Sequence, residues 1–103
     1  MNQYLYQLKL VPRLCNRDAW TLEDEAIVSE HFMRLKHLKD QGIVLLAGKT
    51  NREMEDGFGI VIFKAQDLNS AQTIMHEDPA ITGGVMTATL FDYHIALESL
   101  SKK

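Results

Sequence analysis

Apolar and polar residues alternate over the first segment of the chain, Tyr4–Val11. Every second residue from Tyr4 to Leu10 is Tyr or Leu, and Gln7 and Lys9 lie between them. A period of two residues is typical of a β-strand that buries one face. Pro12 lacks a backbone donor, so we expect the strand to end there and a loop to follow.

The next segment carries the signals of a helix. Thr21 is suited to the N-cap, and Asp24 three residues later completes a capping box. Gly42 supplies the left-handed residue that commonly follows a helix, so the pattern predicts a helix that ends near Gln41. The apolar stripe of this helix is Ile27, Val28, Phe32, Leu35 and Leu38.

Two short apolar segments in the middle of the chain predict a pair of strands. They cover Ile43–Lys49 and Phe58–Ala65, and the polar segment Asn51–Asp56 connects them. The dipeptide Asp56–Gly57 is a typical hairpin signal.

The last third of the chain predicts a second helix and a final strand. The helix covers about Ser70–Glu77, with Asn69 as its cap and Pro79 as its end. The glycine pair Gly83–Gly84 then forms a turn into the strand Met86–Leu97.

The predicted order is strand, helix, strand, strand, helix, strand. We expect one domain over residues 1–98, followed by a polar tail at 99–103. This order is typical of a ferredoxin-like α+β sandwich, in which two helices cover one face of a four-stranded antiparallel sheet.

The two middle strands are apolar on both faces. Val44, Leu46, Val61 and Phe63 alternate with an equally apolar set, although the two helices can cover only one face. A sheet face exposed to water should be polar. A second copy packed sheet to sheet would cover this face, so we expect a homodimer. The alternative is that some of these residues are simply exposed.

Composition and charge narrow the functional class. Hydrophobic residues make up 46% of the 103 residues and charged residues 24%, which is typical of a folded domain. The net charge of -3 argues against nucleic acid as the main partner. The single Cys15 excludes an internal disulfide and suits a reducing compartment. No apolar stretch is long enough to cross a membrane, so we expect a cytoplasmic protein.

Two residues break the local patterns and are candidates for catalysis. His31 lies in the apolar stripe of the first helix, whereas His37 lies on its charged face. Asp78 follows the second helix, where an acidic residue meets the negative end of the helix dipole. An Asp that orients a His is part of many acid–base sites. The alternatives are a hydrogen-bonded core histidine, and an exposed acid partly neutralised by His76.

Other combinations of residues give weaker signals. The four histidines have no metal-ligand spacing, so we expect no metal and no cofactor. Cys15 has no evident neighbouring base. Asp92 and His94 on the last strand suggest a solvated edge or a dimer contact. The aromatic residues Tyr4, Tyr6 and Trp20 either line a pocket or fill the core, and the core is the usual place.

The order of several short motifs resembles the YCII-related (YciI-like) family. These are His31 within Glu30–Leu35, Gly48 at the end of a strand, and Asp78–Pro79 followed by a glycine pair. The resemblance covers nearly the whole domain, to about Tyr93. It implies a dimeric α+β barrel, with a pocket in which a helix-borne His faces the Asp of an Asp-Pro pair. His31 and Asp78 match those two positions.

The chain departs from the family pattern at two positions. Lys49 replaces a common Pro, and it is either a cation that attracts an anionic substrate or, as is more usual, a solvated lysine at the end of a strand. Ala80 replaces an aromatic residue of the pocket wall. We expect Gly48, Lys49 and Arg34 to contact the ligand.

The function that this resemblance implies is acid–base chemistry on a small molecule. We expect a cofactor-independent enzyme or small-molecule binder that uses a His31–Asp78 dyad for a lyase- or hydrolase-like reaction. One alternative is a non-catalytic ligand-binding or interaction module in which the dyad is structural. Another is a cofactor-free monooxygenase.

Overall fold

The computed structural model describes residues 1–51 and 56–99. Two 3-10 turns, Pro12–Cys15 and Arg17–Ala19, occupy the segment predicted as a loop after the first strand. The main elements are β1 (Asn2–Leu10), α1 (Leu22–Asp40), β2 (Val44–Lys49), β3 (Gly59–Ala65), α2 (Leu68–His76), the short α3 (Pro79–Thr82) and β4 (Met86–Tyr93).

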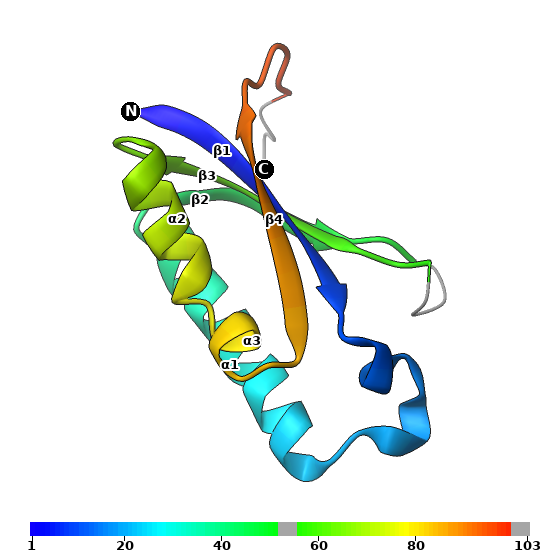
Figure 1. The fold of residues 1–103 in the computed structure, drawn as a ribbon. Coiled ribbons are helices and arrows are strands. Elements are labelled where there is room, and N and C mark those ends of the chain that lie inside the picture. The colour runs from blue at the N-terminus through cyan, green and yellow to red at the C-terminus, as the bar shows by residue number, and fades with distance from the viewer. Residues whose placement is uncertain (52–55, 100–103) are drawn as a thin grey trace.

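The four strands form one antiparallel sheet in the order β2-β3-β1-β4. The helices α1 and α2 lie on one face of this sheet, and no helix of residues 1–51 and 56–99 covers the other face (Figure 1). The predicted ferredoxin-like α+β sandwich is therefore confirmed.

The core lies between the sheet and the helices. Tyr6 at the centre of β1 pairs with Val61 on β3 and with Leu90 on β4. Tyr4 and Tyr6 are buried, as predicted for core residues. A second, smaller cluster surrounds Leu14, and Trp20 packs on it and donates its indole N–H to the Leu14 carbonyl at 2.9 Å. The buried sheet residues of the main core are Tyr4, Tyr6, Leu8, Val44, Val61, Phe63 and Ala65.

An irregularity in β2 corrects one prediction. The alternation placed Leu46 on the same face as Val44, but the register shifts between these two residues. Val44 pairs with Phe63 on the covered face, whereas Leu46 pairs with Ile62 on the uncovered one. The uncovered face is apolar as expected, and its apolar residues are Leu5, Leu46, Ile60, Ile62 and Phe91.

The predicted ends of α1 are close to the observed ones. The Thr21–Asp24 capping box is present, and Gly42 has φ 79° just beyond the helix. One assignment within the helix is wrong, because Phe32 is 64% exposed. The inner surface of α1 includes Arg34 instead, whose side chain is only 21% exposed. A long side chain with an apolar stem can take this place beside the core.

The second half of the chain corrects three predicted boundaries. Asp67 rather than Asn69 caps α2, because Asp67 is extended and accepts a hydrogen bond from the Ser70 N–H at 2.8 Å. Pro79 begins α3 rather than closing α2, as suits a residue without an N–H. The last strand ends at Tyr93. Residues 52–55 of the predicted connection, and the predicted tail from residue 100 on, lie outside the described residues.

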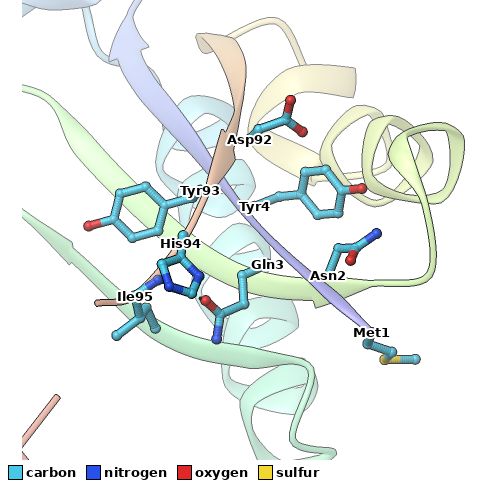
Figure 2. A pocket seen from close by; sticks show the side chains of 8 residues that line it. All are labelled: Met1, Asn2, Gln3, Tyr4, Asp92, Tyr93, His94 and Ile95. Carbon is cyan, nitrogen blue, oxygen red and sulfur yellow. Dashed lines mark hydrogen bonds between the residues drawn. The ribbon is translucent and has the colours of Figure 1, made fainter. Parts of the chain in front are cut away.

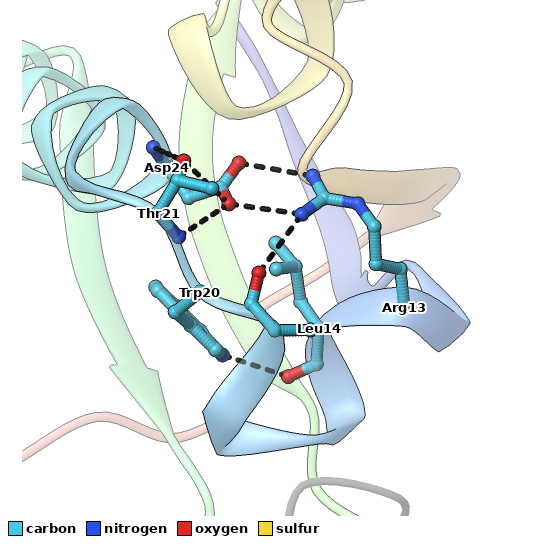
Figure 3. A network of polar contacts seen from close by, with 6 residues as sticks. Arg13, Leu14, Trp20, Thr21 and Asp24 are labelled. Atoms are coloured by element: carbon cyan, nitrogen blue, oxygen red, sulfur yellow. Dashed lines mark hydrogen bonds and ion pairs between the residues drawn. The ribbon is translucent and has the colours of Figure 1, made fainter.

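An ion pair reinforces the start of α1 (Figure 3). Arg13 donates to both carboxylate oxygens of Asp24 at 2.9 Å, and Asp24 also accepts from the Thr21 N–H and hydroxyl. These hydrogen bonds, chiefly those from Arg13, hold the pKa of the Asp24 carboxyl well below its usual range. The network therefore joins the β1–α1 connection to the first turn of the helix.

We predict that Asp24→Asn lowers the thermal stability at neutral pH and that acid removes the difference. A depressed folded-state pKa contributes stability above the unfolded-state value of about 3.9, and this contribution is lost as the pH falls through the folded-state value. Thermal unfolding of the wild type and of Asp24→Asn, followed from neutral pH into the acid range with Asp18→Asn as the control, measures the effect. A constant difference between Asp24→Asn and the wild type at all pH values would contradict the prediction.

Candidate active site

Asp78 occupies a different local position from the one that its sequence suggests. It is the N-cap of α3, with φ -63° and ψ 127°, and its Oδ1 accepts a hydrogen bond from the Ala80 N–H at 2.9 Å. A carboxylate is favourable at this end of a helix, so the expected conflict with the dipole of α2 does not arise. Ala80 is fully buried beside Leu14 and Val85, so it belongs to the core rather than to an exposed pocket wall.

His31 and Asp78 are in direct contact. His31 lies in the middle of α1, and its Nδ1 is 2.6 Å from Asp78 Oδ1, although the two residues are 47 positions apart. The His31 side chain is 11% exposed and that of Asp78 is 0% exposed. The contact depends on the close packing of α1 against α3. A Cβ at Gly83 would come within 2.8 Å of Ile27 Cγ2, so glycine at this position permits that packing.

Tyr6 is a third member of the cluster. Its hydroxyl donates to Asp78 Oδ2 at 2.7 Å from the centre of β1. From the sequence, Tyr6 is expected either to line a pocket or to fill the core, and no pattern connects it with His31 or Asp78. The period of a strand shows which face Tyr6 occupies, but it carries no information about the partner of the hydroxyl.

The surroundings of Asp78 keep its carboxyl group ionised. Burial alone would raise the pKa of Asp78, but the hydrogen bonds from His31 and Tyr6 outweigh burial and hold this pKa below its usual range. An ionised carboxylate only accepts hydrogen bonds, so the short contact requires a hydrogen on His31 Nδ1. In the neutral imidazole, Nε2 then carries a lone pair.

The second nitrogen of His31 is available to a ligand. Within the part of the chain that the structure describes, Nε2 has no hydrogen-bond partner, and it is not among the fully buried nitrogen and oxygen atoms without one. The dyad therefore has the arrangement of an oriented base, in which one nitrogen is held by a carboxylate and the other faces outward.

Arg34 extends the site along α1, one turn after His31. Its Nη2 is 3.7 Å from Glu77 Oε1, and its guanidinium also lies near the Tyr6 hydroxyl. Its Nη1 is buried without a hydrogen-bond partner in the described residues. A buried unpartnered donor is unfavourable, whereas the guanidinium as a whole, with its side chain 21% exposed, is suited to the oxygen of an anionic ligand.

Gly48 and Lys49, the other two predicted ligand residues, lie elsewhere. Gly48 pairs with Ile60 on the uncovered face of the sheet. Both residues line a groove of about 290 Å³, and this lining does not include His31, Asp78 or Arg34. The remaining lining residues are Leu46, Thr50, Phe58 and Ile60.

A larger groove of about 490 Å³ lies at the ends of β1 and β4 (Figure 2). Asp92 and His94 are among its lining residues, and Tyr4 and Tyr93 on the two neighbouring strands point in opposite directions. The groove thus follows the end of the sheet. Its lining includes residues of β1 but does not include His31, Asp78 or Tyr6.

Two further features concern residues 1–51 and 56–99. No group of three or more His, Cys, Asp or Glu side chains there is arranged to hold a metal ion. No helix in this part of the chain is long and apolar enough to cross a membrane. Cys15 is a free thiol of intermediate exposure.

The fold and the cluster define a ferredoxin-like α+β domain with a buried His–Asp pair between its helices. The model of the YCII-related domain matches residues 10–91, so the chain belongs to the YCII-related family. The resemblance predicted from the motifs is therefore confirmed.

One similar solved structure is 5-chloro-2-hydroxyhydroquinone dehydrochlorinase from Burkholderia phenoliruptrix, in complex with 2,5-dihydroxybenzoquinone. The TM-score is 0.60 at 13% sequence identity, and the match covers 89% of this chain and 93% of that chain. At this identity the likeness is one of fold. No curated protein sequence matches the chain.

Proposed function

We propose that the protein is a small cytoplasmic enzyme that catalyses a cofactor-independent acid–base reaction on a small molecule. His31 is the general base and acid, and Asp78 orients it. The observation that carries this proposal is the 2.6 Å contact between His31 Nδ1 and Asp78 Oδ1, which leaves Nε2 open. A histidine serving only to fill the core would be expected to satisfy both nitrogens with protein partners.

The proposed reaction is a lyase-type elimination. Nε2 takes a proton from a carbon or hydroxyl of the substrate, and the released electron pair forms a double bond as a leaving group departs with its own pair. The Asp78 carboxylate stabilises the imidazolium that forms. The proton on Nε2 then passes to the leaving group or to water, which restores the neutral imidazole.

Arg34 supports an anionic substrate. Its partly exposed guanidinium is on the same helix as His31, one turn away, and a charge-assisted hydrogen bond from a guanidinium favours a carboxylate or an ionised hydroxyl. The dehydrochlorinase of similar fold was solved with a dihydroxybenzoquinone, which carries ionisable hydroxyl groups on a ring. We therefore propose a ring compound with an ionised oxygen as the substrate class.

We predict that His31→Ala lowers turnover by at least about 100-fold, because this is the usual contribution of a positioned acid–base group. Halogenated dihydroxybenzenes are the first substrates to test, with halide release and ring absorbance as readouts. His37→Ala is the matched control, since His37 is exposed on the same helix.

We predict that Arg34→Gln raises KM more than it lowers kcat, because Arg34 is proposed to bind the substrate and not to transfer the proton. Steady-state kinetics on the same substrates measure the two constants.

A wild-type rate in His31→Ala would exclude His31 as the base. A loss of thermal stability in His31→Ala, combined with no stabilisation of the wild-type protein by 2,5-dihydroxybenzoquinone and related compounds, would favour the non-catalytic module.

We also propose that the protein is a homodimer whose copies pack through the uncovered sheet face. Leu46 and Phe91 on this face are 51% and 46% exposed in the single chain. Large apolar side chains grouped on one face favour burial against a surface of the same kind.

We predict that Phe91→Lys converts this dimer to a monomer, because an interface would bury the new charge without a partner. Analytical ultracentrifugation of the wild type should give twice the mass of one chain. Phe32→Lys, at a 64% exposed position on α1, is the control and should stay dimeric. A monomeric wild type at micromolar concentration would contradict the proposal.

A further inference from the structure

Tyr6 is held rigidly at the centre of the sheet. It is fully buried on β1, with Val61 and Leu90 as its partners on the neighbouring strands. Its ring meets the ring of Phe63 edge to face, with centroids 5.5 Å apart and an interplanar angle of 72°. Packing of this kind leaves the ring little freedom, so the hydroxyl oxygen has a defined position relative to the sheet.

The hydroxyl of Tyr6 is a hydrogen-bond donor to Asp78. Burial and the adjacent Asp78 carboxylate raise the pKa of Tyr6 far above its ordinary value, and Arg34 lowers it by less. A protonated hydroxyl facing an ionised carboxylate can only donate to it. The 2.7 Å bond therefore runs from the Tyr6 hydroxyl to Asp78 Oδ2.

We propose that Tyr6 is a positioning residue of the acid–base site, which acts on His31 through Asp78. By donating to Oδ2, Tyr6 holds the plane of the carboxylate and leaves Oδ1 to face the imidazole. The inference deepens the proposed function, but its structural part stands on the contacts of Asp78 alone.

The contacts of Asp78 show how this positioning works. The Ala80 N–H and His31 both contact Oδ1, whereas Tyr6 donates to Oδ2, so the two oxygens of the carboxylate have different partners. The bond from Tyr6 comes from the sheet rather than from the helices, so it adds a restraint on the second oxygen and keeps Oδ1 directed at His31. It also draws charge towards Oδ2, so Asp78 is a weaker base and leaves the proton on Nδ1.

The charged groups around this cluster come from the helices. Arg34 of α1 lies near the Tyr6 hydroxyl, and Glu77 at the end of α2 lies 3.7 Å from Arg34. These two side chains are partly exposed and partly offset each other's charge. The Tyr6 hydroxyl is the neutral donor to Asp78 from the sheet side.

The test is the titration of the Asp78 carboxyl carbon by NMR in Tyr6→Phe. Removal of one donor should raise the pKa of Asp78, so the midpoint moves to higher pH. Tyr4→Phe is the matched control, because Tyr4 lies on the same face of β1, packs on Phe63 and does not contact Asp78. Equal midpoints in the two variants would overturn the proposal, whatever the outcome for turnover.

A second measurement uses the unmodified protein and so does not depend on the folding of a variant. A hydroxyl proton held by Asp78 should exchange slowly with water and give an NMR signal with contacts to the Tyr6 ring. The absence of this signal at low temperature, while the hydroxyl of a reference protein with a buried tyrosine–carboxylate bond is visible, would overturn the assignment.

Turnover separates positioning from substrate contact. With a substrate that the wild type converts, the Tyr6→Phe variant should have a kcat about 10-fold lower and a nearly unchanged KM. The reason is that Tyr6 is expected to act through Asp78 and not on the ligand. An increase in KM alone would overturn the positioning role. A failure to find any substrate bears on the proposed function and leaves the titration result as it stands.

Discussion

A fully buried carboxylate must be surrounded by donors, and Asp78 meets this requirement with groups from three parts of the fold. Tyr6 donates from the sheet, His31 from α1 and the Ala80 N–H from the start of α3. An ionised group without such partners would destabilise the domain by several kcal/mol, a large share of the usual stability of a small protein. The position of α3 and the orientation of His31 therefore both depend on this one side chain.

The same requirement connects the contacts of Asp78 with the proposed function. A carboxylate satisfied by three donors stays ionised and immobile, and this state directs the hydrogen of His31 to Nδ1. The free lone pair on Nε2 follows from the hydrogen on Nδ1 and not from any contact that Nε2 makes. Among the described residues the second nitrogen of His31 has no hydrogen-bond partner, and the Arg34 guanidinium lies one turn along the same helix, which is the arrangement on which the proposed function rests.

Local patterns were sufficient to predict most of the fold and part of the site. The alternation in β1, the capping box at Thr21 and Gly42 after α1 depend on neighbouring residues, and each was predicted correctly. The motif order led to the family and to the pair His31 and Asp78. The bulge that turns Leu46 outward was not predictable, because a register shift arises from the pairing with β3. Tyr6 was missed for a similar reason, since its partner is 72 positions away.

The most direct test of the account is the tautomer of neutral His31, which long-range ¹H–¹⁵N NMR spectra reveal. The account predicts a hydrogen on Nδ1 and a bare Nε2, because ionised Asp78 accepts from Nδ1. His37, exposed on the same helix, provides a reference within the same spectrum. A neutral His31 with its hydrogen on Nε2 would contradict the account, since the nitrogen assigned to proton abstraction would then have no lone pair.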